Sequence, residues 1–135
     1  MRPNTLAEAV EEIQAGVTRD AVLAEFIDTF DCAKTDRDRY ASIEREPELT
    51  GDDRLDALVG AVAEYLAKQH RLGRVPHWVS GPARRLVSPW FTTTSPSDAM
   101  REYLTFASPA EFAWRNIFTE ERPLRRARSP QSTKT

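Results

Sequence analysis

The hydrophobic positions at the start of the chain recur at helical spacing and predict a series of short amphipathic helices. Thr5 and Glu8 fit a capping box, so the first helix should begin after Thr5. A second helix should begin after Thr18 and bury one hydrophobic face. A third should cover residues 36–45 and end before Pro47. The buried face of the second helix is expected to hold Val22, Leu23, Phe26, Ile27 and Phe30.

The clearest periodicity follows Gly51 and predicts the central core helix of the protein. Asp52 or Asp53 can cap its N-terminus, and His70 suits the negative end of the helix dipole. Gly73 should end the helix. Small side chains along it, which should allow a neighbouring helix to approach closely, are Ala57, Ala61 and Ala63. Its apolar face carries Leu55, Leu58, Val59, Val62, Tyr65 and Leu66.

The pattern is less regular beyond Gly73, where prolines, tryptophans and phenylalanines are concentrated. Residues 88–95 have no helical period, and we expect an extended loop that Trp90 and Phe91 pin to the body of the protein. Ser-Pro pairs at residues 95–96 and 108–109 are typical of helix starts. The apolar sides of these last two helices should carry Met100, Tyr103, Leu104 and Ala107, and then Phe112, Ile117 and Phe118.

These elements predict an all-α fold, a single compact helical domain of about six helices with a disordered basic C-terminal tail. Within it, residues 1–50 should form an N-terminal helical arm, residues 51–121 a helical core domain and residues 122–135 the tail. The core is expected to contain Leu55, Leu58, Val59, Val62, Leu66, Tyr103, Leu104, Phe112 and Phe118.

Charge is distributed unevenly, although the formal net charge of the 135 residues is only −2. Residues 1–70 carry 8 basic and 16 acidic side chains, whereas residues 71–135 carry 11 and 5. Such an asymmetry suits a partner with a charged surface, but each sign could equally be a solvated helix face.

Several classes of function and location are disfavoured by what the chain contains. No run approaches the roughly 20 apolar residues that span a membrane, and no signal region opens the chain, so we expect a cytoplasmic protein. A Gly-rich phosphate loop and the common hydrolase and metalloprotease motifs are absent from the sequence. We therefore expect no enzyme activity, no catalytic residue and no cofactor.

Metal binding is also not expected. His70 and His77 have no obvious third ligand, and the carboxylates Asp52, Asp53 and Asp56 suit a helix N-terminus without any metal. The single cysteine, Cys32, excludes an intramolecular disulfide and is expected to be a buried structural thiol.

Nucleic-acid binding and protein binding need to be compared. A helix-turn-helix reading of the first two helices is disfavoured, because the second helix sets four carboxylates against Arg19. The basic tail could contact nucleic acid, dock on an acidic protein surface, or serve only as a solubilising end. The tryptophans are more often core anchors than ligand platforms, yet Trp and Arg dominate interface energetics. A partner-facing patch could thus consist of Arg84 and Arg85 beside Trp90, together with Trp114 and Arg115 after Phe112.

The core helix, Pro76-x-Trp78, the Trp90-Phe91 loop and the stretch from Ser108 through Phe112 and Arg115 to Phe118 resemble a group of small actinobacterial proteins. Members are commonly encoded beside a nucleotidyltransferase-like protein, in an arrangement similar to a toxin–antitoxin pair. The resemblance covers about residues 52–120 and implies a binding role rather than a chemistry. Positions that match the group's pattern are Trp78, Trp90, Phe112 and Arg115.

From the resemblance and the charge layout we expect an antitoxin-like binding protein that neutralises a nucleotidyltransferase-like toxin by direct contact. In one geometry, the acidic helices place Glu11, Glu12, Asp28 and Asp31 in a basic nucleotide cleft of the partner. In the rival geometry the interface consists of Trp90, Trp114 and Arg115. The alternative function is a DNA-binding regulator that uses Arg84, Arg85, Arg122, Arg125, Arg126 and Arg128.

Overall fold

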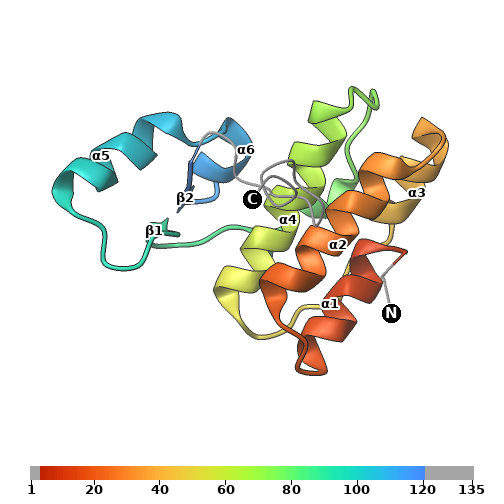
Figure 1. Ribbon diagram of the computed structural model, residues 1–135, viewed down its shortest axis with the longest axis horizontal. Helices are drawn as coiled ribbons and strands as arrows, with labels where there is room; N and C mark the ends of the chain where they lie inside the picture. The colour runs from red at the N-terminus through yellow and green to blue at the C-terminus, as the bar shows by residue number, and fades with distance from the viewer. Residues whose placement is uncertain (1–3, 121–135) are drawn as a thin grey trace, which may run out of the picture. The chain divides into compact units, whose positions relative to one another are not determined.

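A computed structural model describes residues 4–120 and confirms the all-α fold class (Figure 1). The described residues fall into two compact units, residues 4–48 and residues 49–120. The first unit contains α1 (Leu6–Gln14), α2 (Arg19–Cys32) and α3 (Asp36–Glu44). The second contains α4 (Asp53–Gln69), the 3-10 turns η1 (His77–Ser80) and η2 (Pro82–Arg84), β1 (Trp90–Phe91), α5 (Asp98–Ala107), α6 (Ala110–Ala113) and β2 (Ile117–Phe118).

The three helices of the first unit contact one another in all three pairings. The capping box at α1 is confirmed: the Thr5 hydroxyl accepts from the Glu8 amide at 3.1 Å, and the Glu8 carboxylate accepts from the Thr5 amide at 3.2 Å. The predicted apolar stripe of α2 is buried throughout. Because these caps and stripes are local features, the sequence pattern is sufficient to predict them.

Arg39 joins the start of α3 to the end of α2. Its guanidinium donates to the backbone carbonyls of Phe30 at 3.1 Å, Asp31 at 3.2 Å and Ala33 at 2.8 Å. The last carbonyls of a helix have no partner within the helix, and a cation suits the negative end of its dipole. The Arg39 side chain therefore satisfies the C-terminus of α2 and fixes the following turn.

The second unit is built around α4, which η1, η2 and α6 all contact. Asp52 caps the helix, as predicted, by accepting from the amides of Arg54 at 3.0 Å and Leu55 at 3.2 Å. One turn later the buried Asp56 accepts from the amide and hydroxyl of Thr50, at 3.0 and 2.9 Å. These bonds fix the entry of the chain into its longest helix.

The segment predicted as an extended loop forms β1, which pairs in parallel with β2. Trp90 pairs with Ile117 and Phe91 with Phe118, and the two phenylalanine rings stack at a centroid distance of 5.1 Å. Trp90 is buried, so the prediction that it pins this segment is confirmed. β1 lies between η2 and α5 in the chain, and α5 contacts β2.

The helix predicted after Pro109 is much shorter than expected and ends at Ala113. Asn116 takes a left-handed φ of 65°, and its side-chain amide donates to the Leu86 carbonyl at 2.7 Å. Asn tolerates this backbone region better than most residues, so the chain turns here and continues as β2. Ile117 and Phe118 thus lie on a strand rather than on a helix face.

The predicted core is correct in most positions and wrong at Tyr103. That side chain is 51% exposed, whereas its neighbour Leu104 is 2% exposed. Leu58 and Phe118 are half-buried, and the remaining predicted core residues are buried. Since α5 contacts the rest of its unit chiefly through β2, only one side of the helix is covered.

Two further expectations concern the chain as a whole. The predicted disordered tail, residues 122–135, lies outside the described residues. Between residues 4 and 120, no helix combines the length and the apolar character that a membrane crossing requires.

Candidate functional site

Arg115 is the centre of a hydrogen-bonded cluster on the second unit. Its side chain is completely buried, and its guanidinium donates to the Glu64 carboxylate at 2.6 Å. It also donates to the backbone carbonyls of Glu111 at 2.6 Å and Val79 at 2.7 Å. One side chain thereby joins α4, η1 and α6. We call Glu64, Lys68, Glu111, Trp114 and Arg115 the Arg115 cluster.

Glu64, one of the two acidic members of the Arg115 cluster, accepts from three donors. Besides Arg115, the Lys68 ammonium lies 2.8 Å from its carboxylate, and the Trp114 indole N–H donates to it at 3.1 Å. Burial by itself raises the pKa of Glu64, but the hydrogen bonds from Lys68, Arg115 and Trp114 together outweigh burial and lower it. Glu64 is therefore held as a carboxylate.

The basic members of the cluster respond in opposite directions. Burial lowers the pKa of Arg115 below its ordinary value, although Glu64 opposes this effect. The hydrogen bond to Glu64 raises the pKa of Lys68. Because arginine stays protonated in proteins and the pKa of Glu64 is lowered, the contact between Arg115 and Glu64 is an ionic link at neutral pH.

A second arginine, Arg84, is also buried next to α4. Its guanidinium donates to the Asp56 carbonyl at 3.3 Å and lies 4.9 Å from the centroid of the Trp78 ring. Gly60 of α4 makes room for both arginines, since a Cβ there would lie 3.0 Å from Arg84 Cβ and 3.3 Å from Arg115 Nε. At Gly60, the close approach to α4 is made by two arginine side chains.

The residues predicted for the aromatic partner interface differ in exposure. Trp90 and Arg115 are buried, so neither side chain presents a surface to a partner. Trp114 is 39% exposed, and Arg115 and Arg85 lie 4.3 Å and 5.7 Å from its ring centroid. Of the three residues predicted for the aromatic interface, Trp90, Trp114 and Arg115, Trp114 is the one exposed at the surface, and its ring lies against the buried Arg115.

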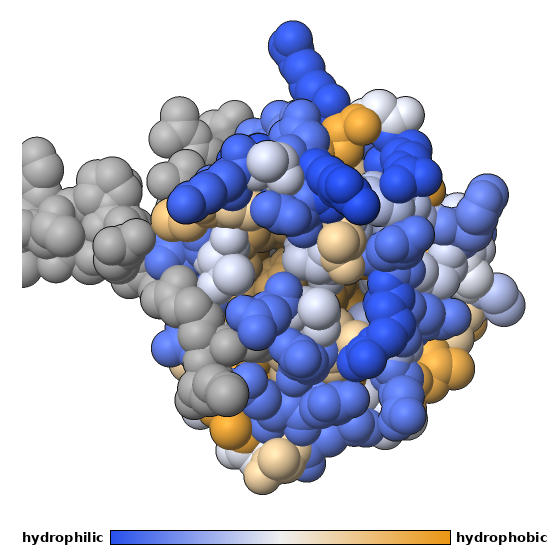
Figure 2. All heavy atoms as spheres, turned by 90° about the vertical axis from the view of Figure 1, so that its right-hand side faces the viewer, coloured by the Kyte–Doolittle hydropathy of each residue, from blue (hydrophilic) through white to orange (hydrophobic). Residues whose placement is uncertain are grey.

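The acidic residues predicted to enter a basic cleft differ in exposure. Glu11 is exposed and lies 3.6 Å from Arg45, whereas Glu12 and Asp31 are half-buried and Asp28 is buried. Residues 4–48 carry 12 acidic and 5 basic side chains, so the first unit is strongly acidic. Figure 2, seen from the side on which Figure 1 draws α3, shows a mostly hydrophilic face with scattered hydrophobic residues.

The basic residues of the nucleic-acid alternative also differ in exposure. Arg84 is buried in the core, and Arg85 is exposed beside Trp114. Residues 49–120 carry 8 basic and 8 acidic side chains and have no net charge. The other residues of this alternative, which lie outside the described residues, are Arg122, Arg125, Arg126 and Arg128.

An apolar stripe on α5 is the feature that the sequence pattern did not identify as a surface. Met100, Tyr103 and Phe106 follow one another at spacings of three residues, and they are 38%, 51% and 82% exposed. Residues three apart lie on the same side of a helix. We call these three residues the α5 stripe. The sequence signal was present, because α5 has more apolar residues than its single buried contact, Leu104, requires.

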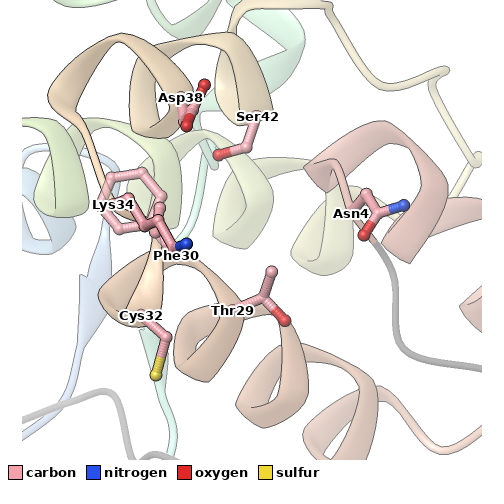
Figure 3. A pocket seen from close by; sticks show the side chains of 8 residues that line it. Asn4, Thr29, Phe30, Cys32, Lys34, Asp38 and Ser42 are labelled. Atoms are coloured by element: carbon pink, nitrogen blue, oxygen red, sulfur yellow. The ribbon is translucent and has the colours of Figure 1, made fainter.

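The first unit has a pocket near the end of α2 (Figure 3). Its volume is about 400 Å³, and Cys32, Asp38 and Ser42 belong to its lining. Cys32 is exposed, which corrects the expectation of a buried thiol; it ends α2, where the helix face turns to solvent. In Figure 3 the thiol points away from Asp38 and Ser42, so these groups do not form a nucleophile–base pair.

Neither metal ligands nor similarity to known proteins indicates a functional site in the described residues. In the part of the chain that the structure describes, no group of three or more His, Cys, Asp or Glu side chains could hold a metal ion. No family model matches the chain, and no curated protein or solved structure matches it either.

Proposed function

We propose that this protein is a non-catalytic binding protein whose helix α5 docks the α5 stripe in an apolar groove of a partner protein. The observation that carries the proposal is the exposure of Tyr103 and Phe106 on a helix whose opposite side, at Leu104, is anchored in the fold. Helices that present apolar residues about one turn apart are a common way of binding a protein groove.

The size of the stripe supports a functional role. Aromatic side chains present roughly 150–250 Å² each, so two exposed aromatic residues and Met100 offer roughly 300–400 Å² of contiguous apolar surface. Patches of about 300–600 Å² on soluble proteins are often functional. Tyr and Met are also enriched at the centres of protein interfaces.

A partner protein fits this surface better than a second copy of the chain. A symmetric pairing of two α5 stripes would bury at most the same 300–400 Å² or so on each copy, less than the roughly 800 Å² per partner of a stable interface. A groove that encloses the helix also covers its flanks and can reach that area. Residues 121–135 offer a single large hydrophobic side chain, Leu124, and cannot match a three-residue stripe.

The charge of the first unit indicates the character of the partner outside the groove. An excess of acidic side chains on residues 4–48 favours a basic partner surface and faster association at low salt. Exposed Glu11 is the candidate of the acidic set that fits this role, while buried Asp28 does not. A nucleotidyltransferase-like toxin, the partner class that the resemblance implies, would supply the basic surface in its nucleotide cleft, and the docking of α5 requires an apolar groove in addition.

Co-expression with the product of the adjacent gene, followed by size-exclusion chromatography, tests the proposal. Wild-type protein should co-elute with the partner, and the double variant Tyr103→Ser/Phe106→Ser should not. Thr105→Ala, which changes an exposed residue of α5 outside the stripe, is the matched control and should co-elute. Co-elution of the double variant would contradict docking through the stripe.

The oligomeric state of the protein without its partner provides a second test. We expect light scattering to give the mass of a monomer for the wild type and for both variants. A dimer that Phe106→Ser dissociates would instead assign the stripe to a second copy. Tighter partner binding after removal of residues 121–135 would assign it to that segment.

A further inference from the structure

Among the described residues, a cleft on the second unit is lined by cationic, hydroxyl, aromatic and proline side chains and by no carboxylate. Its volume is about 590 Å³. Side chains that can donate hydrogen bonds into it are Arg54, Arg101, Thr93, Thr94 and Ser95, whereas the Thr92 hydroxyl donates to the Phe118 carbonyl at 3.5 Å. The volume lies within the range of about 300–1,000 Å³ that is typical of small-molecule sites.

The two arginines come from different helices, and each lies against an aromatic ring of β1. Arg54 is in the first turn of α4, and its Cζ lies 5.2 Å from the centroid of the Trp90 ring. Arg101 belongs to α5, and its Cζ lies 5.3 Å from the centroid of the Phe91 ring. Stacking on an aromatic face orients a guanidinium and leaves its N–H edge available to a ligand.

The guanidinium groups of Arg54 and Arg101 lack hydrogen-bonding partners among the described residues. Among residues 4–120, no side-chain hydrogen bond or ion pair involves the guanidinium of Arg54 or Arg101. This holds although carboxylates are close in sequence, at Asp53 and Glu102. By contrast, the guanidinium of Arg115 is bound to a carboxylate and two carbonyls. The cleft arginines are therefore placed for an external anion.

We infer that this cleft binds the phosphate groups of a small phosphorylated ligand of nucleotide size. Arginine binds phosphate oxygens through two parallel N–H groups, and hydroxyl side chains donate to the remaining oxygens. Two arginines that approach from different elements suit a diphosphate or triphosphate, whose charge is spread over several oxygens. The inference does not depend on the α5 stripe having a partner.

A small ligand fits the cleft better than a nucleic acid. A nucleic-acid strand is held by a row of cationic side chains that follows successive phosphates. Residues 49–120 have equal numbers of basic and acidic side chains, and only two arginines line the cleft. One polyphosphate group is the anion that this arrangement can neutralise.

Isothermal titration of the full chain with ATP, with pyrophosphate and with inorganic phosphate, at low ionic strength, tests the inference. We expect pyrophosphate and ATP to bind with a Kd below about 1 mM and inorganic phosphate to bind more weakly. The variant Arg54→Gln/Arg101→Gln should weaken binding at least about tenfold for each arginine removed. The matched control Arg37→Gln/Arg71→Gln removes the same charge from exposed sites outside the cleft and should leave the Kd unchanged.

Chemical-shift changes locate the ligand. Amides of residues 92–95 should shift on addition of pyrophosphate in the wild type and not in the cleft variant. Equal weakening in the cleft and control variants would show nonspecific attraction and overturn the inference, as would the absence of binding by any of the three probes. Binding of a single-stranded oligonucleotide that pyrophosphate does not compete with would also overturn it.

Discussion

Replacing Arg115 with methionine should strongly destabilise the second unit. The substitution keeps much of the side-chain volume but removes the donors to Glu64, Glu111 and Val79. Two backbone carbonyls then lose their partner, at about 1–3 kcal/mol each, and Glu64 keeps only Lys68 and Trp114. Breaking a buried ion pair typically costs about 3–5 kcal/mol, and we expect a loss of that size.

The assay is urea and thermal denaturation followed by circular dichroism. A loss of about 3–5 kcal/mol should lower the Tm by at least about 10 °C in a domain of this size. The exposed Arg71, replaced by methionine as a control, should change the free energy of unfolding by less than about 0.5 kcal/mol. If Arg115→Met is as stable as this control, the cluster does not hold α4, η1 and α6 together.

Three further predictions concern the same unit. Because the folded-state pKa of Glu64 is lowered, its carboxylate adds stability above its unfolded pKa, and this stability is lost as the pH falls through the folded value. In urea titrations, the stability difference between wild type and Glu64→Gln should thus shrink as the pH falls below the ordinary Glu pKa of 4.5; a constant difference would contradict the pKa shift. Gly60→Ala should destabilise by about 1–3 kcal/mol in chemical denaturation because of its contacts with Arg84 and Arg115, whereas a freely accommodated Gly→Ala change in a helix stabilises by up to about 1 kcal/mol. Leu104→Ala should cost about 2–5 kcal/mol and Phe106→Ala less than about 0.5 kcal/mol, and similar melting curves for the two would refute the orientation of α5.

The sequence predicted the elements whose signals are local. Thr5 and Asp52 cap their helices as expected, because a cap depends on residues two or three positions away. The stripe of α2 is buried as expected for the same reason. The β1–β2 pair was not predicted, since two-residue strands are too short to show an alternating pattern.

The residues that matter most for the candidate site depend on contacts distant in sequence. The burial of Arg115 follows from Glu64, 51 positions earlier, and charged residues are by default expected at the surface. Within α4, Gly60 is a further local signal of a close approach, in addition to Ala57, Ala61 and Ala63. For Tyr103, the periodicity identified an apolar helix face but could not indicate whether the fold or a partner covers it.

The affinity of the co-purified partner for single-residue variants of α5 tests the central claim most directly. In titration calorimetry, Phe106→Ala should weaken binding at least about 30-fold, the effect expected of an interface hot spot, while leaving the stability of the free protein unchanged. Thr105→Ala should bind as the wild type does. A Phe106→Ala variant that binds the partner with wild-type affinity would contradict the account.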